Sequence, residues 1–244
     1  MHGKTGIVIP CYNEAQRINL ESFNAFASAN SLYHICFVND GSTDKTAEFL
    51  AEFCQRNPEQ FSLINLDANS GKGEAVRTGL LSLKKRNEFA SVGFLDADLA
   101  TPLEEYDKLN KTLLSGQYKA VFGSRMKKMG SQIDRSLKRH LIGRFFATVI
   151  SASINLPFYD TQCGAKVFKP TFLDGIIEKP FITKWLFDVE ILIRLKQKIG
   201  KKGIASFVLE KPLDNWTEMG DSKITKADII RIPLDLFKIR KRYQ

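Results

Sequence analysis

The chain has 244 residues, of which 43% are hydrophobic and 26% are charged, and this balance excludes a fibrous or disordered protein. Its formal net charge of +9 predicts an anionic partner, for which nucleic acid, a phosphorylated substrate and an anionic membrane surface are all candidates. The four cysteines show no CxxC spacing, which argues against a zinc site or a disulfide framework and favours a reducing cytoplasm. No apolar run reaches the roughly 20 residues that span a bilayer, and strand-like sequence begins too early for a signal peptide.

The first half of the sequence alternates short apolar runs with longer amphipathic segments. The apolar runs predict strands over 5–9, 35–38, 62–66, 91–95 and 120–123. The segments between them predict helices over 16–29, 42–54, 74–85 and 103–114, the second of them capped by Ser42 or Thr43. This order predicts an α/β fold with a mostly parallel, Rossmann-like sheet that helices cover on both faces.

The second half is less regular. It predicts helices over 136–153 and 185–199, a late strand over 204–209, and a basic C-terminal tail over 226–244. Because no internal repeat, low-complexity tract or linker interrupts the sequence, we expect a single domain over residues 1–244.

Polar residues follow four of the expected strands, in loops 10–14, 39–44, 67–72 and 96–98. Ligands of such sheets bind at the carboxyl ends of the strands. We therefore expect these four loops, which are scattered along the sequence, to converge in space.

The loop Asp96-Ala97-Asp98 places two carboxylates around one small residue, directly after a buried strand. Mg²⁺ and Mn²⁺ prefer oxygen ligands and are commonly held by one or two carboxylates together with substrate phosphates. The motif therefore predicts such a cation, with an ordinary aspartate-rich turn as the alternative.

Two further loops carry groups that suit a nucleotide. Asp40 can accept hydrogen bonds from ribose hydroxyls or a base N–H, and Gly41 permits a tight turn. The backbone N–H groups of 69–73 and the side chain of Lys72 can receive phosphate at the start of a helix. Neither a Walker A loop nor GxGxxG is present, which argues against a dinucleotide enzyme.

Four ordered strings resemble the family 2 glycosyltransferases of the type-A fold: IVIPCYNE (7–14), VNDGSTD (38–44), NSGKGEAV (69–76) and LDADLATP (95–102). Four strings of the second half are similar to the polyprenyl-phosphate hexosyltransferases, and above all to the dolichyl-phosphate β-glucosyltransferase branch: GSR (123–125), DTQCGAKVF (160–168), WLFDVE (185–190) and WTEMGDSKI (216–224).

The resemblance implies transfer of a hexose from a UDP- or GDP-sugar, with UDP-glucose favoured, to a polyprenyl phosphate, with inversion at the anomeric carbon. Residues 1–125 would bind the nucleotide sugar and 126–225 the acceptor. The residues that the resemblance assigns to the nucleotide sugar are Pro10, Tyr12, Glu14, Asp40, Lys72, Asp96, Ala97, Asp98 and Gln162. Asp98, with Asp96, would hold Mg²⁺ or Mn²⁺.

The carboxylate base of enzymes that act on sugar hydroxyls is not evident in this sequence. A phosphate monoester needs no such base, because its second pKa is about 6 and it is largely ionised at neutral pH. We expect it to be held by Arg125, Arg139, Ser222 and Lys223, since arginine binds phosphate through paired donors. The expected catalytic residues are Asp98, Arg125 and Asp188, of which Asp188 either binds the sugar or orients a helix.

Residues 145–158 and the basic tail offer a route to a membrane. A basic start followed by an apolar face suits a helix that lies in the interface, at the cytoplasmic side in this interpretation. A core helix with a solvated tail is the alternative.

Two other functions remain open. A family 2 enzyme with a saccharide acceptor would need a base, for which Asp188 or Asp160 is the candidate. A non-catalytic nucleic-acid-binding module fits the charge, but basic and aromatic residues are not interleaved in one patch, so we expect no nucleic-acid partner. A nucleotidyltransferase lacks support because its glycine-rich, basic N-terminal loop is absent. The oligomeric state stays open.

Overall fold

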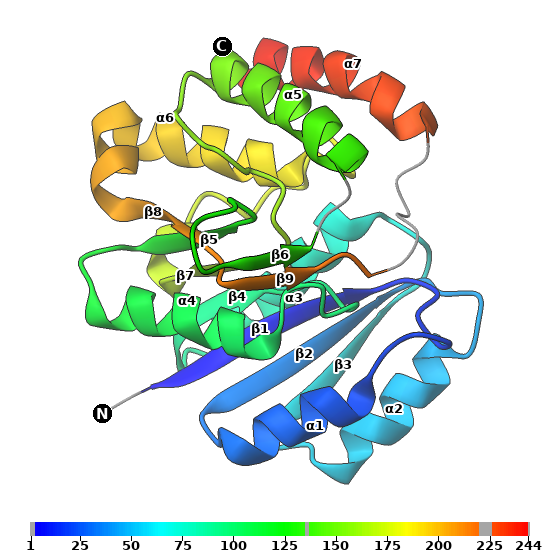
Figure 1. Ribbon diagram of the computed structural model, residues 1–244. Helices are drawn as coiled ribbons and strands as arrows, with labels where there is room; N and C mark the ends of the chain where they lie inside the picture. The colour runs from blue at the N-terminus through cyan, green and yellow to red at the C-terminus, as the bar shows by residue number, and fades with distance from the viewer. Residues whose placement is uncertain (1–2, 135–136, 220–225, 244) are drawn as a thin grey trace.

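A seven-stranded sheet forms the centre of the chain in a computed structural model, which describes residues 3–134, 137–219 and 226–243 (Figure 1). The strands are β1 (Lys4–Cys11), β2 (Tyr33–Asp40), β3 (Phe61–Leu66), β4 (Phe89–Phe94), β5 (Ala120–Ser124), β7 (Lys166–Phe168) and β8 (Val208–Pro212). Their spatial order is β3-β2-β1-β4-β7-β5-β8, and every pair is parallel except the two that β7 makes. The expected mostly parallel sheet is confirmed.

Helices cover both faces of this sheet. One apolar cluster joins it to α1 (Leu20–Ala29), α2 (Thr46–Arg56) and α4 (Leu103–Ser115). The other joins it to α3 (Lys72–Lys85), α5 (Leu137–Ile154), α6 (Phe187–Phe207) and α7 (Lys226–Tyr243), with a short 3-10 helix at Pro170–Leu173. A separate parallel pair consists of β6 (Gln132–Asp134) and β9 (Asn215–Thr217).

Strand residues alternate between the two clusters because successive side chains of a strand point to opposite faces. On β1, Ile7 and Ile9 pack with the α1, α2 and α4 side, whereas Val8 packs with α3. Since both faces are covered, β2 is buried along its whole length. This explains why these strands read as continuous apolar runs.

Several helix starts differ from the sequence prediction, among them those of the first and third helices. The first helix begins at Leu20 rather than 16, because the side chain of Asn19 accepts a hydrogen bond from Ser22 N and caps it there. The third begins at Lys72, two residues before the predicted start, after Gly71 with a φ of 96°.

The predicted strand over 204–209 is wrong in its first half. Helix α6 contains a break at Gly200, whose φ is 71°, and then resumes through Ile204 to Phe207. Strand β8 begins only at Val208. Gly200 has non-helical backbone angles and separates two helical segments, the second of which occupies the first half of the predicted strand.

Strand β7 was not predicted from the sequence. It has three residues, all buried, and its first residue is the charged Lys166. It lies antiparallel between β4 and β5. None of the described helices is long and apolar enough to cross a membrane.

Candidate active site

The polar loops predicted to converge do lie at the carboxyl edge of the sheet, after β1, β2, β3 and β4 (Figure 1). Direct hydrogen bonds join these loops to one another. The contacts described below show which groups hold the loops in place and which groups remain for a ligand.

The loop after β1 is bound to the loop after β2. Asn13 N donates to Ser42 Oγ over 3.0 Å, and Thr43 N donates to Asn13 Oδ1 over 2.9 Å. Glu14 N donates to Thr46 Oγ1 over 2.8 Å. Asn13 has a φ of 50°, a conformation that asparagine tolerates better than most residues. The two motifs therefore form one connected unit.

The prediction that Ser42 or Thr43 caps α2 is wrong. The residue before α2 is Lys45, and it makes no side-chain cap bond. Instead Asp44 Oδ1 accepts from Thr46 N over 3.0 Å. The hydroxyl of Ser42 and the amide of Thr43 serve the contact between the loops instead.

Asp40 joins the loop after β2 to the loop before α3. Its two carboxylate oxygens accept hydrogen bonds from Ser70 N, over 2.7 Å, and Gly71 N, over 2.8 Å. Burial raises the pKa of Asp40, and the two N–H donors oppose this rise. The carboxylate predicted to contact a nucleoside thus also shapes the loop that leads to Lys72.

Lys72 and Asp96 form an ion pair, with 2.5 Å between Nζ and Oδ1. Burial tends to raise the pKa of Asp96, but the Lys72 ammonium overcomes this and holds the pKa below its usual range. The Lys72 ammonium also lies 5.9 Å from the centre of the Trp185 ring. A Cβ at Gly164 would come within 2.0 Å of Asp96 Oδ2, so the glycine of the DTQCG string leaves room for this carboxylate.

The negative charge of Asp98 is balanced less by neighbouring positive charge than that of Asp96. Its Oδ1 accepts from Ala100 N over 3.0 Å, and it makes no ion pair within the part of the chain that the structure describes. Burial raises the pKa of Asp98, and the neighbouring charge of Asp96 adds to the rise. A cation bound at Asp98 would relieve both effects.

The donor set fits a divalent cation that shares its coordination with phosphate. Among the described residues, no group of three or more His, Cys, Asp or Glu side chains could enclose a metal ion. Mg²⁺ and similar ions are commonly held by one or two carboxylates, with water and phosphate oxygens completing the shell. Asp98, with Asp96 beside it, matches this type of site.

Arg125 and Asp160 form a second ion pair with two contacts. Arg125 Nε and Nη2 donate to the two Asp160 oxygens over 2.7 and 2.8 Å. Burial opposes ionisation of Asp160, but Arg125 outweighs it and holds the pKa of the carboxyl well below its usual range. The guanidinium lies 5.5 Å from the centre of the Trp216 ring, so three of the resembling strings meet here.

Lys166 and Asp188 form a third ion pair, which is fully enclosed. Lys166 Nζ lies 2.7 Å from Asp188 Oδ1 and donates to Cys163 O over 2.6 Å. Its ammonium also lies 5.2 Å from the ring centres of both Phe94 and Phe122. Burial raises the pKa of Asp188, and Lys166 opposes this. Sequence reasoning missed Lys166, although a lysine at the start of an apolar run was a usable signal.

The other predicted residues are placed as follows. Pro10, near the end of β1, and Tyr12, directly after it, are partly buried. The buried Glu14 accepts from Arg17 Nη2 over 2.7 Å. Ala97 is buried between the two aspartates. The Nε2 group of Gln162 is buried and has no hydrogen-bond partner in the described structure.

Buried polar groups without partners usually indicate water, an ion or a ligand. Within the described residues, the hydroxyls of Ser124 and Thr161 are likewise buried and without a hydrogen-bond partner. The predicted phosphate ligands Ser222 and Lys223, and the side chain of Arg139, lie outside the described residues.

Known proteins match this chain in sequence and in structure. Residues 6–171 match the family model described as "Glycosyl transferase family 2". A dolichyl-phosphate β-glucosyltransferase of Trichomonas vaginalis is 33% identical over 96% of this chain and 70% of its own length. The enzyme of the same name from Saccharomyces cerevisiae is 33% identical over 97% of this chain and 74% of its own length.

The structural match extends over almost the whole chain. The glucosyl-3-phosphoglycerate synthase of Mycobacterium tuberculosis, solved with Mn²⁺, UDP and glucosyl-3-phosphoglycerate, has a TM-score of 0.70. It is 16% identical and covers 98% of this chain and 80% of its own. At this identity the likeness concerns the fold alone.

Proposed function

We propose that this chain, which belongs to glycosyl transferase family 2, transfers glucose from UDP-glucose to a polyprenyl phosphate. As a member of that family it is a glycosyltransferase of the type-A fold. The transfer inverts the anomeric carbon and takes place at the cytoplasmic face of a membrane. The observation that carries the proposal is Asp98, a partly buried carboxylate that makes no ion pair among the described residues and lies next to the Lys72–Asp96 pair at the carboxyl edge of the sheet. The names of the related enzymes support glucose and the polyprenyl acceptor.

The donor binds in the first half of the site. Pro10, Tyr12, Glu14 and Asp40 hold the nucleoside, on loops that Asn13 and Asp40 tie together. Lys72 faces the diphosphate, and Gln162 offers its unpartnered amide to the sugar.

Asp98, assisted by Asp96, holds a Mg²⁺ or Mn²⁺ ion. Such an ion supplies Lewis-acid stabilisation of the departing nucleoside diphosphate. Lys72 adds positive charge next to Asp96 and limits the repulsion between the two carboxylates. In this arrangement the chain neutralises the leaving group, and binding in a partly buried site strengthens that effect.

The acceptor needs no base from the protein. Asp160 and Asp188 are each buried in an ion pair, with Arg125 and Lys166, so neither is free to take a proton from a hydroxyl. An ionised phosphate oxygen is already nucleophilic. Arg125, whose Nε and Nη2 are held by Asp160, presents its Nη1 to that phosphate, together with Arg139, Ser222 and Lys223.

A lipid-extraction assay tests the proposal. Purified protein is incubated with detergent-dispersed polyprenyl phosphate, Mg²⁺ or Mn²⁺, and labelled UDP-glucose, UDP-galactose or GDP-mannose in parallel. We expect metal-dependent label from UDP-glucose in the organic phase, and none with the variant Asp98→Asn. Label from another donor would correct the sugar or the nucleotide.

The saccharide alternative makes an opposite prediction. If Asp188 were a base, Asp188→Asn would abolish transfer while the donor still bound with wild-type affinity. Donor hydrolysis without a lipid product, dependent on Asp98, would favour that alternative over a polyprenyl phosphate.

A further inference from the structure

Large apolar side chains lie exposed on the outer surface of α5 and α7. On α5 these are Leu141, Phe145 and Val149, which are 61%, 65% and 40% exposed. On α7 they are Leu234 and Phe237, which are 61% and 66% exposed. We call these five residues the outer stripe.

The spacing places the outer stripe on one side of each helix. Residues four apart share a helix face, so Leu141, Phe145 and Val149 line up along α5. Ile150 and Ile154, on the opposite side of α5, are buried in the core. Half of the apolar segment predicted to reach the membrane is thus core, and the other half is outer surface.

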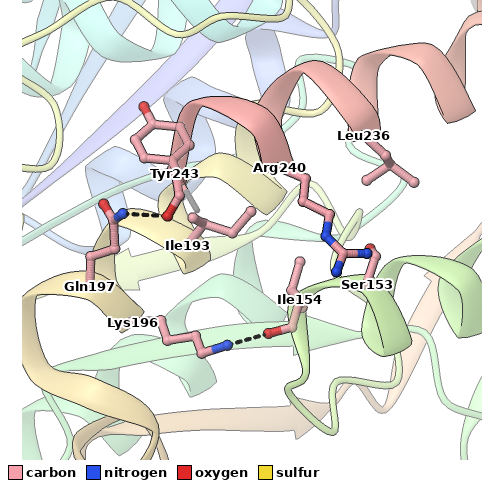
Figure 2. A pocket seen from close by; sticks show the side chains of 8 residues that line it. All are labelled: Ser153, Ile154, Ile193, Lys196, Gln197, Leu236, Arg240 and Tyr243. Carbon is pink, nitrogen blue, oxygen red and sulfur yellow. Dashed lines mark hydrogen bonds between the residues drawn. The ribbon is translucent and has the colours of Figure 1, made fainter.

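Helix α7 has the same two-sided character. Leu236 and Ile239 are buried, whereas Leu234 and Phe237 are not. Figure 2 shows the inner side, where Leu236, Arg240 and Tyr243 line a cavity of about 180 Å³ between α5, α6 and α7. The two helices pack against one another and against α6, on the side away from the first helices of the chain (Figure 1).

The charges around the outer stripe are basic. Lys238 and Lys241 are exposed and fall on the same side of α7 as Leu234 and Phe237. The sequence of α7 also carries Lys226, Arg231, Arg240 and Arg242, against two acidic residues, Asp228 and Asp235. Asp235 pairs with Lys238. An apolar face bordered by lysine and arginine is complementary to an anionic lipid surface.

Helix α5 is tied to the segment that holds Arg125. Arg144, next to Phe145 in sequence, donates to Tyr159 O over 2.6 Å, directly before Asp160 of the Arg125 pair. Both α5 and α7 begin on the side of the molecule where the parallel strands end (Figure 1). The loop that follows α5 carries Asp160, which holds Arg125.

We infer that the outer stripe is a docking surface for the headgroup and acyl boundary of an anionic bilayer, and that it sets the active site at the level of the acceptor phosphate. This inference rests on the proposed function, because a membrane-bound acceptor gives the surface its role. Leu141, Phe145 and Val149 insert along α5, Leu234 and Phe237 along α7, and Lys238 and Lys241 contact the headgroups.

Flotation with vesicles tests the surface itself, without donor or acceptor. We expect the wild-type protein to float with phosphatidylcholine–phosphatidylglycerol vesicles and to bind pure phosphatidylcholine less. The double variant Phe145→Ser/Phe237→Ser is expected to bind at least about tenfold more weakly, because each buried aromatic contributes substantially to partitioning. Phe49→Ser is the matched control, since Phe49 is a 41% exposed phenylalanine on α2. Equal binding by the double variant and the control would overturn the inference.

A transfer assay with two acceptors separates the docking surface from the chemistry. With polyprenyl phosphate embedded in vesicles, we expect the transfer activity of the double variant to be about tenfold or more below that of the wild type. With a water-soluble, short-chain polyprenyl phosphate it should match the wild type, which also shows that it is folded. Equal loss with both acceptors would overturn the docking role. If the wild type transferred no sugar to any polyprenyl phosphate, the proposed function would be rejected. The flotation experiment would still test whether the outer stripe binds vesicles.

A second copy of the chain is the competing occupant of the outer stripe. If a second copy covered the stripe, sedimentation would show that the wild type is a dimer and the double variant a monomer, while both bind vesicles equally. In that case the stripe would be a subunit interface and the inference would be wrong.

Discussion

The two halves of the active site differ in the contacts that dominate them. In the donor half, besides the Lys72–Asp96 ion pair, Asn13 and Asp40 tie three loops together through hydrogen bonds to backbone N–H groups. In the acceptor half, Arg125 and Lys166 are buried in ion pairs with Asp160 and Asp188. A hydrogen bond lost from the first half costs about 1 kcal/mol, whereas a charge left unpaired in the second costs about 3–5 kcal/mol. Damage to the donor half should therefore be graded, and damage to the acceptor half severe.

The largest effect on activity is expected at Asp98, whose hydrogen bond from Ala100 N stays within its own loop. Asp98→Asn should lower transfer by about 10³-fold or more, since it removes the cation ligand that stabilises the departing charge. Its melting temperature should not fall, because the pKa of Asp98 is raised by burial and the neutral side chain relieves that cost. Asp174→Asn, at an exposed ion pair with Lys84, is the control for a lost aspartate. Wild-type activity in Asp98→Asn would remove Asp98 from the mechanism.

The largest effect on stability is expected at Lys166. Lys166→Met leaves Asp188 buried without its partner and should cost about 3–5 kcal/mol, which is roughly 6–20 °C in melting temperature for a chain of this size. The double variant Lys166→Met/Asp188→Leu should recover most of that loss, because no buried charge remains. Urea denaturation measures both. A single variant as stable as the wild type would show that the acceptor half does not depend on paired charges.

Asn13 tests the donor half. Asn13→Ala removes the hydrogen bond from Thr43 N to the Asn13 side chain and places alanine at a φ of 50°, at a combined cost of about 1–3 kcal/mol. We expect the dissociation constant of UDP, measured by calorimetry, to rise about tenfold. Asn13→Gly keeps the backbone conformation and loses only the side-chain bond, so its effect should be smaller. Equal effects would assign the whole loss to the hydrogen bond.

The pH dependence should separate Asp98 from Asp160, because their pKa values are shifted in opposite directions. The pKa of Asp98 lies above the ordinary 3.8, so transfer should fall on acidification before ordinary aspartates are protonated. The pKa of Asp160 is depressed, so its contribution to stability is lost only at lower pH. Circular dichroism should therefore stay native while kcat/KM falls. Because metal and proton compete for Asp98, more Mg²⁺ should move the acid limb to lower pH; an immobile limb would assign it to another group.

The smallest effect is expected at Tyr243, far from the chemistry. Its hydroxyl donates to Glu190 Oε1 over 2.6 Å and accepts from Arg194 Nε over 2.8 Å, which fixes the end of α7 on α6. Tyr243→Phe should cost about 1 kcal/mol, or roughly 2–4 °C, because Glu190 and Arg194 still pair with each other. A loss as large as that of Lys166→Met would mean that these two residues depend on the hydroxyl.

The sequence allowed prediction of the parallel sheet and of the convergence of its loops, since both follow from apolar periodicity and from the connection rules of βαβ units. It did not allow prediction of the pairing of charges. Lys166 and Asp188 are separated by a turn, a 3-10 helix and a loop, so no local spacing relates them. Gly200 misled the prediction of β8, because its left-handed conformation breaks a helical pattern that then resumes.

Strand β7 has a consequence for the order in which the chain folds. Strand β4 pairs with β1 on one side and β7 on the other, and β5 joins the rest of the sheet only through β7. Until residue 168 has left the ribosome, β4 presents an unpaired edge, which is open to pairing with other chains. The string 160–168 contains both Gly164, which lies against Asp96, and β7, so one segment completes the donor site and the sheet. We expect fragments that end before Lys166 to aggregate. The shortest fragments that remain dispersed should extend past Phe168.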